Sequence, residues 1–311
     1  MKKLLGLTIA MLVMVLAACS GESASEDSTQ SDDEKLTVTT TIGQIADGVK
    51  NIGGDKVEVI SLMGPGTDPH LYKATQGDIA KFEEADVIFY NGLHLEGKIL
   101  EVLEKMNADK PTYAIAENVS EGELLEDAED RSAADPHVWF DIDLWKQALK
   151  KVEEGLIEAD PDNQAFYEEN AQKYYAELDD LKEFAAEEMS SIPEDQRVLV
   201  TAHDAFGYFG NAYDMEVMGL QGISTESEYG LGDVQSLVDT LTEREIKAVF
   251  VESSISEKSI NAVIEGAKDK GHTVTIGGEL YSDAMGEEGT EEGTYIGMYR
   301  HNVETIADAL K

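Results

Sequence analysis

Residues 163–189 read NQAFYEENAQKYYAELDDLKEFAAEEM, a run that contains neither glycine nor proline. The run is rich in Ala, Glu, Lys, Leu and Tyr. The tripeptide Asp160-Pro161-Asp162 precedes it and Pro193 lies just beyond its end, so it carries the start and stop signals of a helix. At about 1.5 Å per residue, the predicted helix is about 40 Å long and could run the length of a domain. We therefore expect one stiff connection between two halves of the chain.

Short β-rich runs alternate with helical patterns on both sides of this predicted helix. Before it, the predicted strands are 36–40, 57–62, 87–90 and 112–115, and the predicted helices are 42–52, 75–84 and 96–106. After it, the predicted strands are 198–201, 216–219, 248–252 and 273–276, and the predicted helices are 205–213, 232–242, 256–270 and 294–310.

Strands that alternate with helices indicate parallel sheets, one in each half. The predicted fold class is α/β, with two lobes that each hold a mainly parallel sheet flanked by helices and that are joined by one long backbone helix. The predicted boundaries are 36–162 for the N-terminal lobe, 163–190 for the linking helix and 191–311 for the C-terminal lobe.

The composition excludes some classes of function. The chain has 311 residues, with 64 Asp or Glu against 24 Lys or Arg and a net charge of −40. Hydrophobic residues make up 42%, which is enough for an ordinary core. So strong a negative field repels phosphate backbones, and the sequence therefore predicts no nucleic-acid partner.

The N-terminus predicts export. Lys2 and Lys3 precede the apolar run Leu4–Leu16, which is too short to span a membrane as a mature helix. The run continues into Ala17-Ala18-Cys19 and resembles a bacterial lipoprotein signal, which implies removal of residues 1–18 and a lipid on the Cys19 thiol. The alternative is a simple secretory signal with an incidental cysteine. Residues 19–35 are rich in Ser, Glu and Asp and are expected to form a flexible acidic tether.

Four short loops hold the candidate chemistry. They are GTDPHLY at 66–72, DPHVWFD at 135–141, TAHDAF at 201–206 and GELYSD at 278–283. Open parallel sheets bind ligands beyond the carboxyl ends of their strands, so two facing lobes would bring these loops together. In the first two loops proline fixes the backbone beside His70 and His137, and Asp68 or Asp135 could orient the imidazole as a hydrogen-bond acceptor.

Three imidazoles and one carboxylate suit a borderline divalent cation such as Zn²⁺ or Mn²⁺. For any single histidine, a hydrogen-bonded structural role is the alternative. Half of the six histidines lie in loops of this design, which favours ligation by His70, His137 and His203. The other three, His94, His272 and His301, are expected not to be ligands.

At these loops the sequence resembles a known family. The matching stretches are 62–70, 92–98, 135–140, 202–209 and 277–286, and the likeness extends from about residue 36 to residue 311. They resemble the manganese- and zinc-binding solute-binding proteins of ABC importers (cluster A-I), above all the manganese-binding lipoproteins of Gram-positive bacteria. The resemblance implies that His70 and His137 are the ligands from the N-terminal lobe, while His203 and Asp283 are those from the C-terminal lobe.

The same resemblance implies a function and partners. Such a protein captures its metal in an interlobe cleft and delivers it to a membrane permease, which is driven by a cytoplasmic ATPase. We expect a monomer that is held by its lipid on the extracytoplasmic face of the cell membrane, and we expect no enzymatic activity.

The choice of metal stays open between two ions. Zinc-dedicated relatives commonly carry a His-rich acidic loop before the second ligand motif, whereas residues 117–134 are acidic but contain no histidine, which favours Mn²⁺ as the cargo. Against this, some manganese members have Glu in place of His203, and zinc normally outbinds manganese at a given site. Zn²⁺, or both ions, is the alternative.

Two other classes of function are remote alternatives. A secreted metal-dependent hydrolase would use Glu252 as its best candidate base, but the sequence has no His-Glu-x-x-His helix and four protein ligands leave little room for a catalytic water. The alternative for Glu252 is a structural role or one in which it orients a ligand. A surface adhesin would need an exposed apolar patch.

Overall fold

The structure is a computed structural model and describes residues 35–127, 133–227 and 229–311. The predicted signal peptide, Cys19 and all but the last residue of the predicted tether lie outside these residues. No helix in the three described ranges combines the length and apolarity that crossing a membrane requires.

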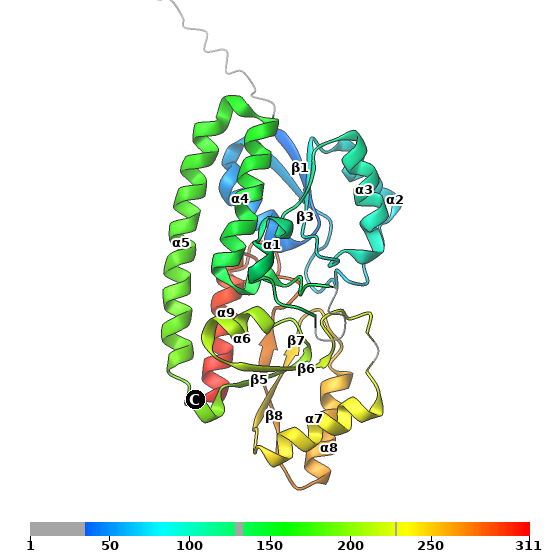
Figure 1. The fold of residues 1–311 in the computed structure, drawn as a ribbon, viewed down its shortest axis with the longest axis vertical. Coiled ribbons are helices and arrows are strands. Elements are labelled where there is room, and N and C mark those ends of the chain that lie inside the picture. The colour runs from blue at the N-terminus through cyan, green and yellow to red at the C-terminus, as the bar shows by residue number, and fades with distance from the viewer. Residues whose placement is uncertain (1–34, 128–132, 228) are drawn as a thin grey trace, which may run out of the picture. The chain divides into compact units, whose positions relative to one another are not determined.

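The N-terminal lobe contains one parallel sheet with the strand order β2-β1-β3-β4. Its strands are β1 (Leu36–Thr40), β2 (Val57–Ser61), β3 (Val87–Tyr90) and β4 (Thr112–Ala114), and its helices are α1 (Gly43–Gly53), α2 (Gln76–Glu84), α3 (Leu100–Asp109) and α4 (Ile142–Ala159). Figure 1 shows α1 and α4 on one side of the sheet and α2 and α3 on the other. The predicted strands of this lobe are confirmed to within a residue.

Helix α4 was absent from the sequence prediction. It begins after Asp141, whose carboxylate accepts the backbone N–H groups of Asp143 and Leu144. Its interior contains Gly155, which weakens a helical pattern. A Cβ at Gly155 would lie only 2.7 Å from a ring carbon of Phe89, so tertiary packing against β3 requires the glycine there.

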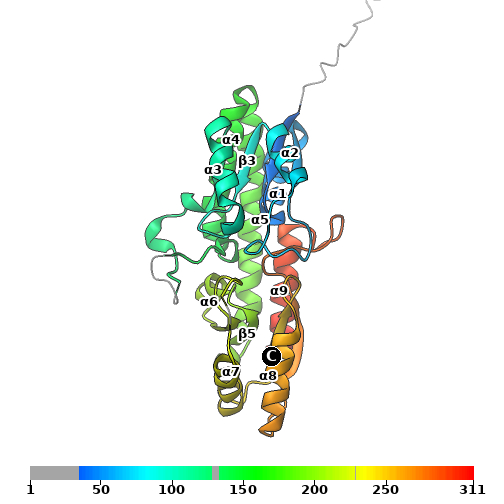
Figure 2. The same ribbon diagram turned by 90° about the vertical axis from the view of Figure 1, so that its right-hand side faces the viewer.

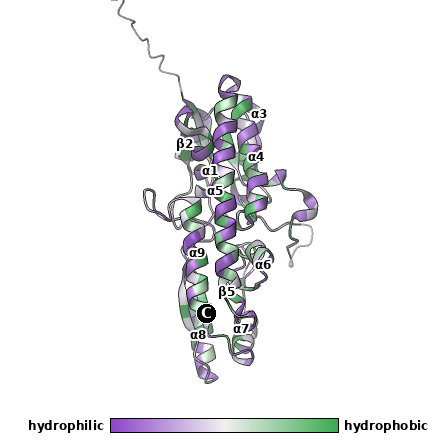
Figure 3. Cartoon of the chain, turned by 90° about the vertical axis from the view of Figure 1, so that its left-hand side faces the viewer, coloured by the Kyte–Doolittle hydropathy of each residue, from purple (hydrophilic) through white to green (hydrophobic). Residues whose placement is uncertain are grey.

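The predicted linking helix is confirmed as α5 (Gln164–Ser190). Its buried residues recur every three or four positions, which places them on one face: Tyr167, Ala171, Tyr174, Leu178, Leu181, Ala185 and Met189. This face packs against α1 and α4 of the N-terminal lobe and against α9 (Tyr295–Leu310) of the C-terminal lobe. Figures 1 and 2 both place α9 beside the C-terminal half of α5, and Figure 3 shows hydrophilic turns along the outer side of α5.

The C-terminal lobe contains two parallel strand pairs. The strands are β5 (Val198–His203) with β6 (Glu216–Gln221) and β7 (Ala248–Glu252) with β8 (Thr275–Leu280), and the other helices are α6 (Gly207–Tyr213), α7 (Leu231–Glu243) and α8 (Lys258–Asp269). The sequence predicted one sheet here. Strands β5 and β7 do lie side by side, but at their carboxyl ends the Glu252 side chain, and not a backbone carbonyl, accepts the N–H of His203.

One hydrophobic core reaches into both lobes. It contains the fully buried aromatic residues Trp139 and Trp145 from the first lobe, and Phe206, Tyr295 and Tyr299 from the second. The hydroxyl of Tyr295 donates to the backbone oxygen of Trp139 at 2.6 Å, and the indole N–H of Trp139 donates to the backbone oxygen of Ser282 at 3.2 Å. Buried aromatic residues therefore hold the 135–141 loop against the segment that carries Asp283.

Candidate metal centre

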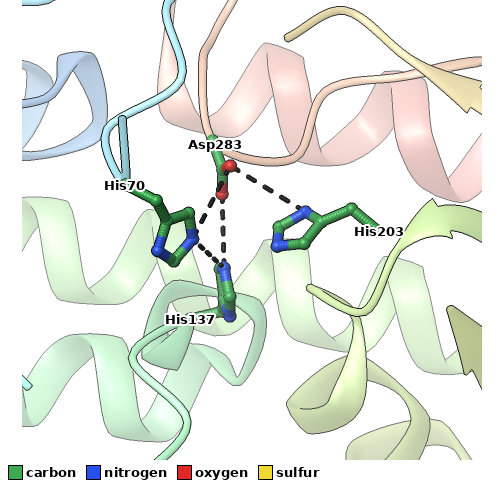
Figure 4. Close-up of side chains that lie close together, drawn as sticks. All are labelled: His70, His137, His203 and Asp283. Carbon is green, nitrogen blue, oxygen red and sulfur yellow. Dashed lines mark hydrogen bonds and ion pairs between the residues drawn. The ribbon is translucent and has the colours of Figure 1, made fainter. Parts of the chain in front are cut away.

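The structure brings together the four predicted ligands, which come from four separate loops. His70 follows β2, His203 ends β5, Asp283 follows β8, and His137 precedes α4. Each contributes one donor atom, and these atoms lie within 4.8 Å of one another. All four side chains are at most 2% exposed. Figure 4 shows the three imidazoles arranged around the carboxylate of Asp283.

Two of the distances between donor atoms match a tetrahedral coordination shell, and the others, up to 4.8 Å, are wider. The two Nε2 atoms of His70 and His137 are 3.4 Å apart, and Nε2 of His137 is 3.3 Å from Oδ1 of Asp283. Oδ2 of Asp283 is 3.9 Å from Nε2 of His70 and 3.9 Å from Nδ1 of His203. Bonds of about 2.0–2.2 Å would place neighbouring donors of a tetrahedral site about 3.3–3.6 Å apart.

The carboxylate of Asp283 lacks ordinary partners. Both of its oxygens are buried, and neither has a hydrogen-bond partner within the described part of the chain. Burying an ionised carboxylate that accepts no hydrogen bond destabilises a fold by several kcal/mol, on the order of what any buried ion costs. A bound cation would satisfy both oxygens, and the donor set of nitrogen and oxygen atoms suits a borderline divalent ion.

In two of the imidazoles, a hydrogen bond fixes which ring nitrogen faces Asp283. Oδ1 of Asp135 accepts the Nδ1–H of His137 at 2.7 Å, as predicted, and this leaves Nε2 of His137 facing Asp283. Nε2 of His203 lies 2.9 Å from the backbone oxygen of Ile223. Because a carbonyl oxygen only accepts, this nitrogen carries a proton, and Nδ1 of His203 lies 3.3 Å from Oε2 of Glu252 and 3.9 Å from Oδ2 of Asp283.

The corresponding prediction for Asp68 was wrong. Although Asp68 occupies the same place in its Asp-Pro-His motif as Asp135, its Oδ1 accepts the backbone N–H of His70 at 2.9 Å and not a ring nitrogen. Its Oδ2 accepts the hydroxyl of Thr225, at 2.7 Å, from the other lobe. The sequence contained no signal for this contact, because 157 residues separate the two partners.

Glu252 contacts a candidate ligand and is not free to activate a water. Its Oε1 accepts the backbone N–H of His203 at 2.8 Å, and its Oε2 lies 3.3 Å from Nδ1 of the same residue. The side chain is fully buried. This geometry agrees with the structural role that was the alternative for Glu252.

Burial and the neighbouring carboxylates give the three imidazoles very different pKa values. Burial lowers the pKa of His70 to about 3. Burial acts in the same direction on His137 and His203, but Asp135 and Asp283 raise the pKa of His137 to about 9, and Asp283 and Glu252 raise the pKa of His203 to about 10. Burial would raise the pKa of Asp283, but the three imidazoles outweigh it and hold that pKa well below its ordinary value. Asp283 is therefore ionised at neutral pH.

The remaining three histidines lie outside this cluster. His94 is exposed and has a φ of +65°. The Nε2 atom of His272 lies 2.5 Å from the backbone oxygen of Ile246, and that of His301 lies 2.9 Å from the backbone oxygen of Glu279. Both imidazoles thus have ordinary structural partners.

Two cavities each have one residue of the cluster in their lining. One, of about 550 Å³, is lined by Asp283, by Met63 and by residues of α1. The other, of about 450 Å³, is lined by His70 and Lys98 from the N-terminal lobe and by Ile223 and Glu226 from the C-terminal lobe. An ion could approach the buried donors by either cavity.

Known proteins that are similar to this chain in sequence are metal-binding proteins. The family model "Zinc-uptake complex component A periplasmic" (ZnuA) matches residues 38–309. The manganese-binding lipoprotein MntA of Bacillus subtilis is 56% identical over 98% of this chain and 99% of its own length. The zinc-binding protein TroA of Treponema pallidum is 49% identical over 89% of this chain and 90% of its own.

Solved structures show the same fold. The structure of TroA from Treponema pallidum matches with a TM-score of 0.87 and 47% identity, over 89% of this chain and 99% of that one. Fe(III)-bound YtgA from Chlamydia trachomatis matches with a TM-score of 0.80 and 26% identity, over 89% of this chain and 98% of that one. The chain therefore belongs to the ZnuA family of metal-binding, substrate-binding proteins of ABC importers.

Proposed function

We propose that this protein captures Mn²⁺ with His70, His137, His203 and Asp283 and delivers it to the permease of its ABC importer. The observation that carries the proposal is the buried carboxylate of Asp283, which accepts no hydrogen bond within the described residues and is surrounded by three imidazoles whose donor atoms lie within 4.8 Å of it and of one another. Two of these imidazoles, His137 and His203, hydrogen-bond through the ring nitrogen that points away from Asp283, so that the other ring nitrogen faces the site. Membership of a family of transport proteins excludes the hydrolase interpretation.

Two observations favour manganese over zinc as the cargo. A relative with 56% identity is named as manganese-binding, and residues 117–134 lack the histidines of a zinc-type loop. Zn²⁺ is the second candidate, because a relative with 49% identity is named as zinc-binding and three imidazoles suit zinc. Elemental analysis of protein purified from its native envelope, followed by competition between Mn²⁺ and Zn²⁺, decides between the two ions.

The N-terminal sequence supports a location for this activity. We propose that residues 1–18 are removed, that Cys19 receives the lipid, and that residues 19–35 tether a monomer to the extracytoplasmic face of the membrane. The lobes would then comprise residues 36–162 and 191–311, with residues 163–190 between them. A Cys19→Ala protein should lose its membrane anchor, and unchanged anchoring would contradict the proposal.

Calorimetric titration of single variants tests the ligand set. Replacement of any one of the four residues by Ala should weaken metal binding by orders of magnitude. His272→Ala and His301→Ala are matched controls, because each removes a hydrogen-bonded imidazole outside the site, and both should bind as wild type does. If the His203→Ala or Asp283→Ala protein bound metal as wild type does, the replaced residue of the C-terminal lobe would not be a ligand.

A further inference from the structure

Residues 222–227, which we call the β6 loop, contact both halves of the metal centre. Within this loop, the backbone oxygen of Ile223 accepts the Nε2–H of His203 at 2.9 Å. The hydroxyl of Thr225 donates to Oδ2 of Asp68 at 2.7 Å. One short segment thus contacts a candidate ligand of its own lobe and, through Asp68, a segment of the other lobe.

The contact between Thr225 and Asp68 bears directly on His70. Asp68 uses its second oxygen, Oδ1, to accept the backbone N–H of His70 at 2.9 Å, so one carboxylate joins the Thr225 hydroxyl to the His70 backbone. Thr225 is 7% exposed and Asp68 is half-buried, so the bond is partly shielded from solvent. A hydroxyl that donates to a carboxylate forms one of the stronger hydrogen bonds in a protein.

The β6 loop is itself fixed beside His203. Gln221 pairs with His203 in the ladder between β5 and β6. Its side-chain amide donates to the backbone oxygens of Thr225 and of Ser227, the latter at 3.0 Å. At the surface, Nζ of Lys98 in the N-terminal lobe lies 2.6 Å from Oε2 of Glu226. A displacement of this loop would therefore disturb His203 and Asp68 together.

We propose that Thr225 is a positioning residue that holds His70 in place from the opposite lobe and thereby slows release of the bound ion. The inference rests on the proposed metal-binding function. It differs from that function in assigning a role to a residue that donates no ligand atom. Through the β6 loop, the position of His70 in one lobe depends on the position of His203 in the other.

The test is the rate at which Mn²⁺ and Zn²⁺ leave the protein when excess chelator is mixed with the loaded protein in a stopped-flow instrument. Thr225→Val removes the hydroxyl and keeps the shape, and we expect release to be faster by about tenfold, the factor that one such hydrogen bond supplies. Thr225→Ser keeps the hydroxyl and should release the ion at a rate near that of wild type.

Two further variants complete the test. Thr242→Val is the matched control: its hydroxyl donates to the backbone oxygen of Val238 in the same lobe, away from the site, so the release rate should not change. Glu226→Gln removes the charge that pairs with Lys98. Because the side chains of Lys98 and Glu226 are 37% and 40% exposed, this ion pair is weak, and release should be faster by only about twofold.

The outcomes separate this inference from the proposed function. If wild-type protein binds metal and Thr225→Val releases it at the wild-type rate, the role of Thr225 is refuted and the metal site stands. A Thr225→Ser protein that releases the ion as fast as Thr225→Val would also refute it, because the hydroxyl would then be irrelevant. If wild-type protein binds neither ion, the proposed function itself fails.

Discussion

Metal binding at neutral pH should release about two protons for each ion bound. The carboxylates of the site raise the pKa of His137 to about 9 and that of His203 to about 10, so both imidazoles carry an extra proton at pH 7 in the metal-free protein. An ion needs the lone pairs of Nε2 of His137 and Nδ1 of His203, so each must lose one proton. His70, with its pKa lowered to about 3, and Asp283, which is ionised, contribute none.

The magnitude follows from this count. If two protons leave with each ion bound, a fall of one pH unit should weaken binding about a hundredfold, or about 2.7 kcal/mol, between about pH 6 and 8, where both imidazoles are still protonated in the metal-free protein. The stability of the metal-free protein should depend on pH in the opposite direction and decrease as the pH rises. Because the folded pKa values of His137 and His203 are raised, their contribution to stability is complete below about pH 6.5 and is lost as the pH rises through about 9 and 10.

Calorimetry in buffers of different ionisation enthalpy measures the number of protons released. Asp135→Asn removes the carboxylate that accepts the Nδ1–H of His137, so the pKa of His137 should fall and the count should drop toward one. His301→Gln, outside the site, should leave it unchanged. A wild-type count below one, or an affinity that does not depend on pH between 6 and 8, would refute these charge assignments.

Three further predictions concern stability. At free metal a hundredfold above Kd, the wild-type protein should gain about 2.7 kcal/mol in its free energy of unfolding, which melting curves with metal and after chelation will measure. Gly155→Val should lower that free energy by about 1–3 kcal/mol in urea, because the new side chain would overlap the rings of Phe89 and Tyr113; an unchanged value would mean that α4 can shift without cost. Tyr174→Phe should cost about 1–3 kcal/mol, because its hydroxyl donates to the buried Asp47 at 2.8 Å; a melting temperature equal to that of wild type would show that this bond contributes nothing.

Much of the fold could be predicted because local and tertiary signals agree along most of the chain. In α5 the apolar residues recur at helical spacing and no residue opposes the helix. The runs that predicted strands are strands, and β1, β3, β5 and β7 are mostly buried. In α4 the two kinds of signal conflict, since Gly155 is unfavourable in a helix but necessary beside Phe89. Packing prevails there, and propensity alone could not show it.

The candidate ligands could be predicted for a different reason from the residues that they contact. His70, His203 and Asp283 lie at or beyond the carboxyl ends of strands, where parallel sheets bind ligands, so the topology predicts that they meet between the lobes. The contacts around them depend on details that no short motif records. Asp68 and Asp135 occupy equal places in two Asp-Pro-His motifs, yet only Asp135 bonds the imidazole, and the hydroxyl that Asp68 bonds comes from the other lobe.

The same contacts bear on how the ion enters and leaves. The two lobes share a core, and buried hydrogen bonds cross between them, such as those from Tyr295 to Trp139 and from Tyr299 to Phe140. A wide rotation of one lobe about α5 would break these bonds and expose aromatic surface, whereas movement of a loop that carries a ligand would not. The β6 loop contacts the other lobe through the hydrogen bond from Thr225 to Asp68 and the exposed ion pair between Glu226 and Lys98. Together these two contacts stabilise the lobe interface much less than the shared core does. Exchange of the ion is therefore least costly when the loops move and the lobes stay packed.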